Sequence, residues 1–171
     1  MAGDDFRRGV RLGVDVGLVR VGVAVCDPDG MLATPLRTLK RDAKKDHDMR
    51  VLADLAVERE AIQVYVGLPR SLGGGETAST RMARDYARSL AERLRSAGSG
   101  ATVWLVDERL TTVSAHRSLR EAGLDGRKHR QVVDQVAAAD ILQHALNMQK
   151  SLKRDVGVAV ECDSRPATDQ T

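Results

Sequence analysis

Residues 10–25 read VRLGVDVGLVRVGVAV, and this stretch decides the fold. Apolar residues alternate with small or polar ones from Val10 to Val16, which predicts a strand. The alternation resumes from Val21 to Val25, after a short turn over Gly17 to Arg20. A short turn between two alternating segments is typical of a hairpin, so we expect these strands to pair antiparallel.

The rest of the chain adds a strand to this hairpin and then alternates helices with strands. Met31 to Leu39 could form a third strand, in which Pro35 favours an edge position. Further along, the patterns predict a helix within 46–60, a strand over 62–67, a helix between Glu76 and Gly98, a strand over 101–106, and helices over 113–121 and 131–150. This order predicts an α/β fold: a mixed five-stranded sheet, with a three-stranded antiparallel meander plus two parallel strands, flanked by helices.

The composition fits one globular domain. The chain has 171 residues, 42% hydrophobic and 30% charged, which is enough to bury a core without disulfide or metal staples. We expect one domain over residues 1–150 and a flexible tail over 151–171, where the periodicity is lost. The chain opens without an apolar signal region, and no apolar run reaches the roughly 18 residues of a membrane span. We therefore expect a cytoplasmic protein.

Aromatic and charged residues restrict the modes of nucleic-acid binding. One Trp, two Tyr and one Phe are too few for a module that grips single strands by stacking bases on rings. Lys and Arg number 27 against 24 Asp and Glu, so the net charge is only +3. Any affinity for nucleic acid must therefore come from clustered cations. Cys26 and Cys162 make neither a disulfide framework nor a zinc site.

Two acidic residues have unusual positions in the predicted sheet. One lies inside an apolar strand, and the other follows the carboxyl end of a strand. Asp15 interrupts an apolar strand, where helices on either face would desolvate it. Its charge needs either a hydrogen-bonded network or a divalent cation, and the sequence ranks the two equally. Glu108 follows the strand that ends at Val106, at the carboxyl end where open α/β sheets place their ligands. The structural alternative is that Asp107 and Glu108 cap and charge the next helix.

Asp134 is the most informative acid, because its spacing places it on the apolar face of the last helix. It precedes Ala137, Ala138, Ile141 and Ala145 by three, four, seven and eleven residues. Lys128 or Arg130 could instead neutralise it structurally. Asp15, Glu108 and Asp134 could meet over the first strand, and an all-oxygen cluster without His or Cys suits Mg²⁺ or Mn²⁺ rather than zinc. Asp140 turns away from this face, and we treat it as a flanking residue.

Basic clusters give candidate contacts for a nucleic-acid backbone. The helix after Glu76 carries Arg81, Arg84 and Arg88 on the face opposite its apolar residues, although a merely solvated face would look the same. A second patch beside the proposed site contains Lys128, His129 and Arg130. Basic residues around an acidic metal cluster are what a phosphodiester hydrolase needs, since cations position the backbone while metals activate water.

Short motifs occur in order along most of the chain. They are GVDVG at 13–17, RVGVAV at 20–25, VGLP at 66–69, DERLTT at 107–112 and DQVAA at 134–138. Each is weak alone, but the combination resembles the bacterial YqgF family, also called the Holliday junction resolvase or pre-16S ribosomal RNA nuclease family. The resemblance runs from about Arg11 to Gln143.

This resemblance implies an RNase H-like fold and a metal-dependent endonuclease. Asp15, Glu108 and Asp134 would be the catalytic acids that bind metal, and Arg20, Arg109 and Thr111 lie in the same motifs and would contact nucleic acid or shape the site. Departures from the family pattern are Leu18-Val19 after the first motif and the loop RSLGGG at 70–75. Both segments lie where substrate contacts are expected.

Three functions follow from these observations. The first is an endonuclease that processes the 5′ end of the pre-16S rRNA in ribosome biogenesis. The second is resolution of four-way DNA junctions, which requires two symmetric cuts and so favours a homodimer. The third is a non-catalytic ribosome assembly factor that binds nucleic acid and keeps its acids for structural reasons.

Overall fold

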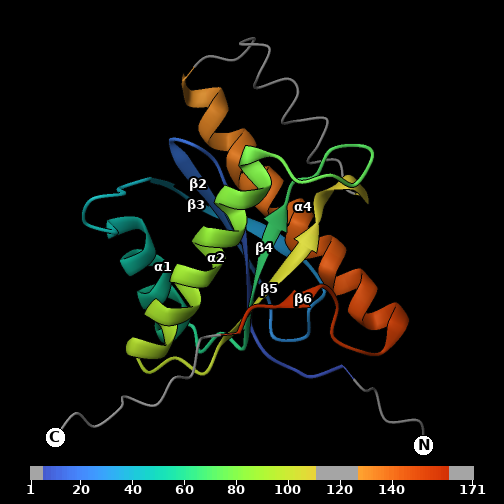
Figure 1. Ribbon diagram of the computed structural model, residues 1–171. Helices are drawn as coiled ribbons and strands as arrows, with labels where there is room; N and C mark the ends of the chain where they lie inside the picture. The colour runs from blue at the N-terminus through green and yellow to red at the C-terminus, as the bar shows by residue number, and fades with distance from the viewer. Residues whose placement is uncertain (1–5, 111–126, 162–171) are drawn as a thin grey trace, which may run out of the picture.

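A mixed β-sheet forms the centre of the chain in the computed structural model, which describes residues 6–110 and 127–161 (Figure 1). Its strands are β1 (Arg11–Val16), β2 (Arg20–Cys26), β3 (Ala33–Lys40), β4 (Gln63–Leu68), β5 (Thr102–Asp107) and β6 (Val158–Ala159). Their spatial order is β3-β2-β1-β4-β5-β6. The predicted hairpin is confirmed, since β1 and β2 pair antiparallel with Val14 opposite Val23.

The remaining pairings confirm the predicted fold class and add one strand to it. β3 continues the antiparallel meander as the edge strand beside β2, while β4 and β5 are parallel to β1. The sixth strand, β6, was not predicted. It lies in the segment expected to be a tail, and it pairs antiparallel with β5 through Trp104 and Ala159. A two-residue strand is too short for sequence periodicity to reveal.

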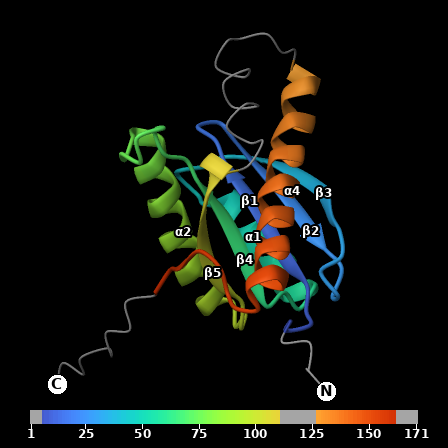
Figure 2. The same ribbon diagram turned by 90° about the vertical axis from the view of Figure 1, so that its right-hand side faces the viewer.

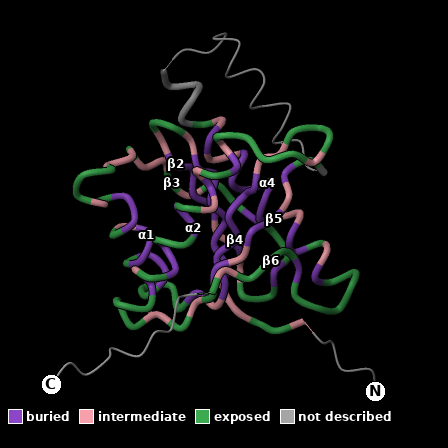
Figure 3. Tube along the Cα trace, in the orientation of Figure 1, coloured by how far each residue is buried: buried purple, intermediate pink, exposed green. Residues whose placement is uncertain are grey.

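Helices cover both faces of the sheet. α1 (His47–Glu58) and α2 (Ala78–Ser96) pack on one face, and α4 (Arg127–Leu152) packs on the other. Figure 2 shows the sheet between α2 and α4. The helix expected over 113–121 lies outside the described residues. The burial pattern agrees with this layering, because the central strands are buried and the outer surfaces of the helices are exposed (Figure 3).

The two faces of β1 carry different residues because the two layers differ. Leu12, Val14 and Val16 point toward α1 and α2 and belong to the larger apolar core. The opposite face of the same strand has Gly13 and Asp15, and it meets the alanine-rich side of α4. Small residues on both partners let this helix lie close to the sheet.

Two local features set the ends of α2. A capping box opens the helix, in which the Thr77 hydroxyl accepts from the backbone N–H of Thr80 and the Thr80 hydroxyl accepts from that of Thr77. Arg93 and Arg95 in the last turn complement the negative end of the helix dipole.

None of the helices among residues 6–110 and 127–161 is long and apolar enough to span a membrane.

A buried polar network occupies the amino-terminal ends of the parallel strands. The Gln63 side-chain oxygen accepts hydrogen bonds from Arg11, Tyr65 and Gln149 at 2.8–3.0 Å. Arg11 also donates to the carbonyls of residues 7 and 9, and Gln63 donates to Asp155. Burial lowers the pKa of Arg11 and raises that of Tyr65. The network therefore ties the start of the described chain and the segment after α4 to the sheet.

Candidate active site at the carboxyl edge of the sheet

Asp15 lies on the face of β1 that packs against α4, with only 1% of its surface exposed. Its neighbour two residues earlier is Gly13, where an added Cβ would stand 2.5 Å from the Ala138 carbonyl oxygen. Successive side chains of a strand alternate between faces, so Asp15 and Gly13 share this side. The first acid is thus placed under α4, at the carboxyl end of a central strand.

Asp134 lies above the strand next to Asp15. Gly22 of β2 pairs directly with Asp15, and a Cβ on Gly22 would collide with the backbone carbonyl of Asp134. Only glycine permits this approach, which explains an otherwise unfavourable residue in a strand interior. The Asp134 side chain is buried, with 3% of the residue exposed.

Glu108 reaches the same layer from the other side of Asp15. It opens the short 3-10 helix η1 (Glu108–Leu110) directly after β5, and 2% of it is exposed. A Cβ on Gly67 of β4 would collide with its Oε1 and would lie 2.5 Å from Cδ1 of Ile141 in α4. Since Val66 pairs with Val14, Gly67 and Asp15 are each one residue further along adjacent strands.

The three acids therefore lie along a row that crosses three neighbouring strands, between the sheet and α4, which itself carries Asp134. The order across the sheet is Asp134 over β2, Asp15 on β1 and Glu108 over β4. The predicted role of these three acids as a common metal site stays a prediction. Glycines at 22 and 67 make the space for the two outer acids.

Arg20 holds Asp134 in place. Its Nε donates to Oδ2 of Asp134 at 2.9 Å, with 24% of the arginine side chain and 4% of the aspartate side chain exposed. The two terminal nitrogens of this guanidinium make no hydrogen bond to a described residue. Arg20 thus balances a buried carboxylate on one side and presents donors toward solvent on the other.

The donor set fits a hard divalent cation, although the acids do not form a closed cage. Carboxylate oxygens are the ligands that Mg²⁺ and Mn²⁺ prefer, and all three acids are buried on one face. Within residues 6–110 and 127–161, no group of three His, Cys, Asp or Glu side chains is gathered closely enough to hold a metal ion.

Arg109 stands at the rim, bound to Asp107. Its Nη2 and Nε donate to Asp107 Oδ2 at 2.6 and 3.0 Å, and its backbone N–H donates to Oδ1. The pair lowers the pKa of Asp107 and raises that of Arg109. Arg109 Nη1 stays near the loop of residues 70–75, since a Cβ on Gly74 would lie 3.1 Å from it.

The arginines of α2 differ in their surroundings. Arg84 forms an ion pair with Glu76 at 2.7 Å, and Arg88 approaches Asp85 at 3.8 Å. Arg81 is exposed and makes no ion pair with any residue that the structure describes. The predicted stripe is therefore partly neutralised, and Arg81 is its most available member.

The structure does not describe the side chains of four predicted nucleic-acid contacts. Thr111 is outside the described residues, and Lys128, His129 and Arg130 are described only as backbone in the first turn of α4. The glycines at 22 and 67, which were not predicted as site residues, had a signal in the sequence. Both interrupt apolar strands, as glycine does where another group approaches closely.

Comparisons with known proteins define the class of molecule. The mixed sheet with helices on both faces is the α/β architecture expected from the sequence. A family model described as "RuvX: Holliday junction resolvase" matches residues 9–148. The chain belongs to this RuvX family of nucleases, also called YqgF, and the resemblance seen in the sequence is confirmed.

Similar proteins occur in several bacteria. The chain is 51% identical over 147 residues to a protein of Mycobacteroides abscessus, covering 86% of each, and 48% identical over 160 residues to one of Streptomyces coelicolor, covering 93% of this chain and 92% of the other. Both carry the name "Putative pre-16S rRNA nuclease". Among solved structures, RuvC of T. thermophilus in complex with Holliday junction substrate has 15% identity and a TM-score of 0.49, covering 88% of this chain and 99% of that one.

Proposed function

We propose that this chain is a Mg²⁺- or Mn²⁺-dependent endonuclease that processes the 5′ end of the pre-16S rRNA in the cytoplasm. The observation that carries the proposal is the row of three buried carboxylates, Asp134 of α4, Asp15 of β1 and Glu108 of η1, over the neighbouring strands β2, β1 and β4. Buried acids at the carboxyl edge of an α/β sheet are costly for stability and are typical of a functional site. The choice of RNA follows the names of the relatives.

The proposed roles follow from the position of each side chain. Asp15, Glu108 and Asp134 would hold the cation, which when bound would supply Lewis-acid activation of water and of the leaving 3′ oxygen. Arg20 would orient a substrate phosphate through its terminal nitrogens, which the ion pair with Asp134 leaves available. Arg109, fixed by its ion pair with Asp107, would donate from Nη1 to a phosphate of the nucleic-acid backbone at the rim of the site.

The first experiment compares two substrates. Purified protein is incubated with a labelled pre-16S rRNA fragment and with a four-way DNA junction, each in Mg²⁺, Mn²⁺ or EDTA. Asp15→Asn serves as the inactive control, because it keeps the shape of the side chain and removes its charge. Metal-dependent cutting of the RNA, lost in EDTA and in the variant, is the expected result.

Junction resolution is the second candidate function, because the matching family model carries that description. Cutting the junction and leaving the RNA intact would favour it, and a homodimer in light scattering would then be expected, since the two cuts are related by symmetry. If neither substrate is cut in any metal while both bind tightly, the non-catalytic assembly factor replaces the nuclease.

A further inference from the structure

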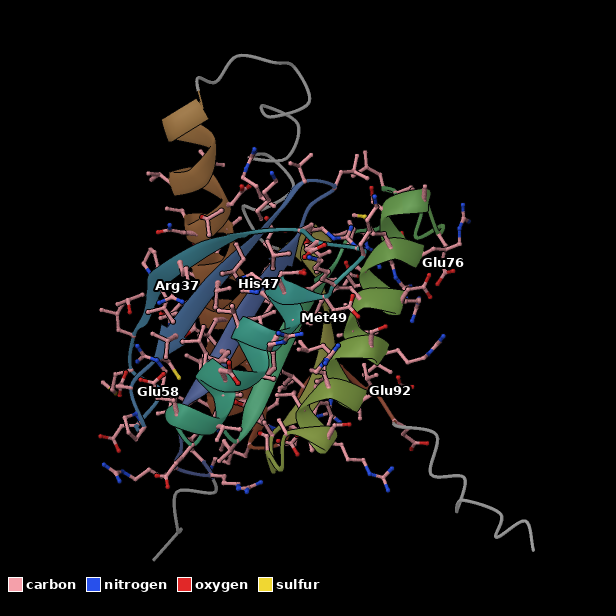
Figure 4. All side chains as sticks on the ribbon, turned by 90° about the vertical axis from the view of Figure 1, so that its left-hand side faces the viewer. Arg37, His47, Met49, Glu58, Glu76 and Glu92 are labelled. Atoms are coloured by element: carbon pink, nitrogen blue, oxygen red, sulfur yellow. The ribbon has the colours of Figure 1, made fainter. Side chains whose placement is uncertain are left out.

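A pocket on the α1 and α2 face opens next to the turn that leads out of the candidate site. Its volume is about 390 Å³, and it is lined by Arg41, Arg81, Met82 and Tyr86 together with residues of α1 and α2. Figure 4 looks onto this face and labels Met49, which also lines the pocket. The volume suits one small ligand or one unit of a longer chain.

Arg41 is held rigidly in the wall of this pocket. Its guanidinium lies 5.4 Å from the ring centroid of Tyr86, and its Nη1 donates to the Gly17 carbonyl at 3.3 Å and lies 3.1 Å from Met82 Sδ. Tyr86 is fixed in turn, because its hydroxyl donates to the buried Asp48 at 2.8 Å. Nε and Nη2 of Arg41 make no hydrogen bond to a described residue. A guanidinium fixed in this way loses little entropy when it binds an anion.

Contacts of the β1–β2 turn connect this pocket to the acids. The Gly17 carbonyl that Arg41 contacts is two residues beyond Asp15, at most about 7 Å along an extended chain. The Arg41 backbone N–H also donates to the Val19 carbonyl. Arg41 therefore clamps the turn from the α1 and α2 face, while Arg20 at the end of the same turn contacts Asp134 on the α4 face.

Four basic residues at this edge of the sheet are linked by strand pairing, chain neighbourhood or a shared pocket lining. Arg20 pairs with Lys40 across the hairpin, Arg41 follows Lys40 in the chain, and Arg81 lines the same pocket as Arg41. Lys40 and Arg81 are exposed. Asp85 is the acid in the pocket lining, and Arg88 lies 3.8 Å from it. A chain of phosphates is the ligand that matches a row of cations leading away from a nuclease site.

We propose that this pocket is a phosphate subsite for a single-stranded segment flanking the cut, with one backbone phosphate between Arg41 and Arg81. The strand crosses the Gly17 to Val19 turn from Arg20, and its sugar rests on the apolar floor formed by Met82. The group that this subsite recognises is the backbone phosphodiester, which RNA and DNA share. This inference rests on the proposed nuclease function and names where its substrate continues.

The test measures binding in an inactive protein, so that it does not depend on cleavage. Asp15→Asn is the background, and fluorescence anisotropy gives Kd for a labelled single-stranded RNA and for DNA of the same sequence at several salt concentrations. The variants added to it are Arg41→Gln and Arg81→Ala. Arg59→Ala is the matched control, because Arg59 is an exposed arginine at the far end of α1 with no ion pair among the described residues.

We expect each subsite variant to weaken binding by about fivefold at low salt and to reduce the slope of log K against log salt by about 0.7, one phosphate contact. Arg59→Ala should leave both unchanged. Equal losses in all three variants, or none in either subsite variant, would overturn the subsite. Arg81→Ala decides the question alone if Arg41→Gln unfolds in a thermal melt. Equal effects on RNA and DNA identify the phosphate as the recognised group, while an effect on RNA alone would contradict phosphate recognition.

Cleavage is measured separately, so the two proposals can fail independently. In the protein with Asp15 intact, Arg81→Ala should raise KM for the rRNA fragment and leave kcat almost unchanged, because it removes binding away from the reacting atoms. Loss of binding in the subsite variants without any cleavage by the intact protein would retain the subsite and reject the nuclease. Cleavage by the intact protein, with an unchanged KM in Arg81→Ala, would retain the nuclease and reject the subsite.

Discussion

The Arg20 Nε lies 2.9 Å from Oδ2 of Asp134, so one of the three buried acids already forms an ion pair with a guanidinium. This contact joins the start of β2 to α4 across the sheet. A cation that binds at Asp134 must share or displace that guanidinium, since both are attracted to the same oxygens. In the proposed nuclease site, this pair would therefore link the substrate contact of Arg20 to metal binding at Asp134.

Arg20→Gln is expected to tighten Mn²⁺ binding. Removing the guanidinium frees Asp134 and removes a nearby positive charge, and the expected gain is about tenfold, or about 1.4 kcal/mol. Isothermal titration or the electron paramagnetic resonance signal of free Mn²⁺ measures it without any turnover. Arg59→Gln is the control for a change in net charge. Weaker Mn²⁺ binding in Arg20→Gln would instead show that Arg20 positions Asp134 for the metal.

Asp15→Asn is expected to abolish cleavage and to keep the fold. An amide cannot supply the charge that holds a divalent cation, so we expect a loss of at least about 100-fold in rate. The rate of rRNA cleavage in Mn²⁺ measures this effect, and circular dichroism checks the fold. Asp54→Asn, at an exposed position of α1, is the control. An unfolded Asp15→Asn protein beside a folded Asp54→Asn protein would assign Asp15 to structure.

Gly22→Ala is expected to destabilise the protein by about 1–3 kcal/mol, because the new methyl group would overlap the Asp134 carbonyl. Urea unfolding gives the free energy of unfolding. Gly100→Ala is the matched control, since nothing lies within 4 Å of a Cβ built there. If the two variants unfold at the same urea concentration, α4 does not approach β2 as closely as described.

The ion pair between Asp107 and Arg109 predicts a pH dependence. Arg109 lowers the pKa of Asp107, so the stabilisation from this pair is present above the ordinary pKa of an aspartate, near 3.9, and is lost as the pH falls through the lowered value. Arg109→Gln should raise the pKa of Asp107, as measured by carboxyl carbon NMR shifts. Arg59→Gln should leave it unchanged. An unaltered Asp107 pKa in Arg109→Gln would mean that the rim contact is not formed in solution.

Strong local patterns explain why the fold could be predicted. The alternation on either side of Gly17 specified the β1–β2 hairpin, and the apolar stripe after Gln131 specified α4. The two-residue β6 and the beginning of α4 at Arg127 were missed. A strand of two residues is too short to show a hydrophobic alternation. The ends of helices depend on tertiary contacts that a sequence pattern does not reveal.

The candidate site was predictable where one strand or helix determines a direction, and less so where side chains from distant segments meet. Asp134 could be placed on the buried side of its helix from spacing alone. Its partner Arg20 lies 114 residues away in sequence, and no local pattern predicts that contact. The clamp of Arg41 on Gly17 was missed for the same reason, since it depends on how β3 and α2 pack.

The polar network around Gln63 has a practical consequence for handling the protein. Arg11 and Gln63 are the first residues of β1 and β4, whereas Asp15 and Glu108 stand at the carboxyl ends of the strands. Through this network both ends of the described chain are attached at the side of the sheet away from the acids. A fluorophore or a surface tether attached near residue 7 or residue 155 would therefore leave the edge that carries Asp15 and Glu108 facing open solution, where a large substrate of the proposed nuclease could approach it.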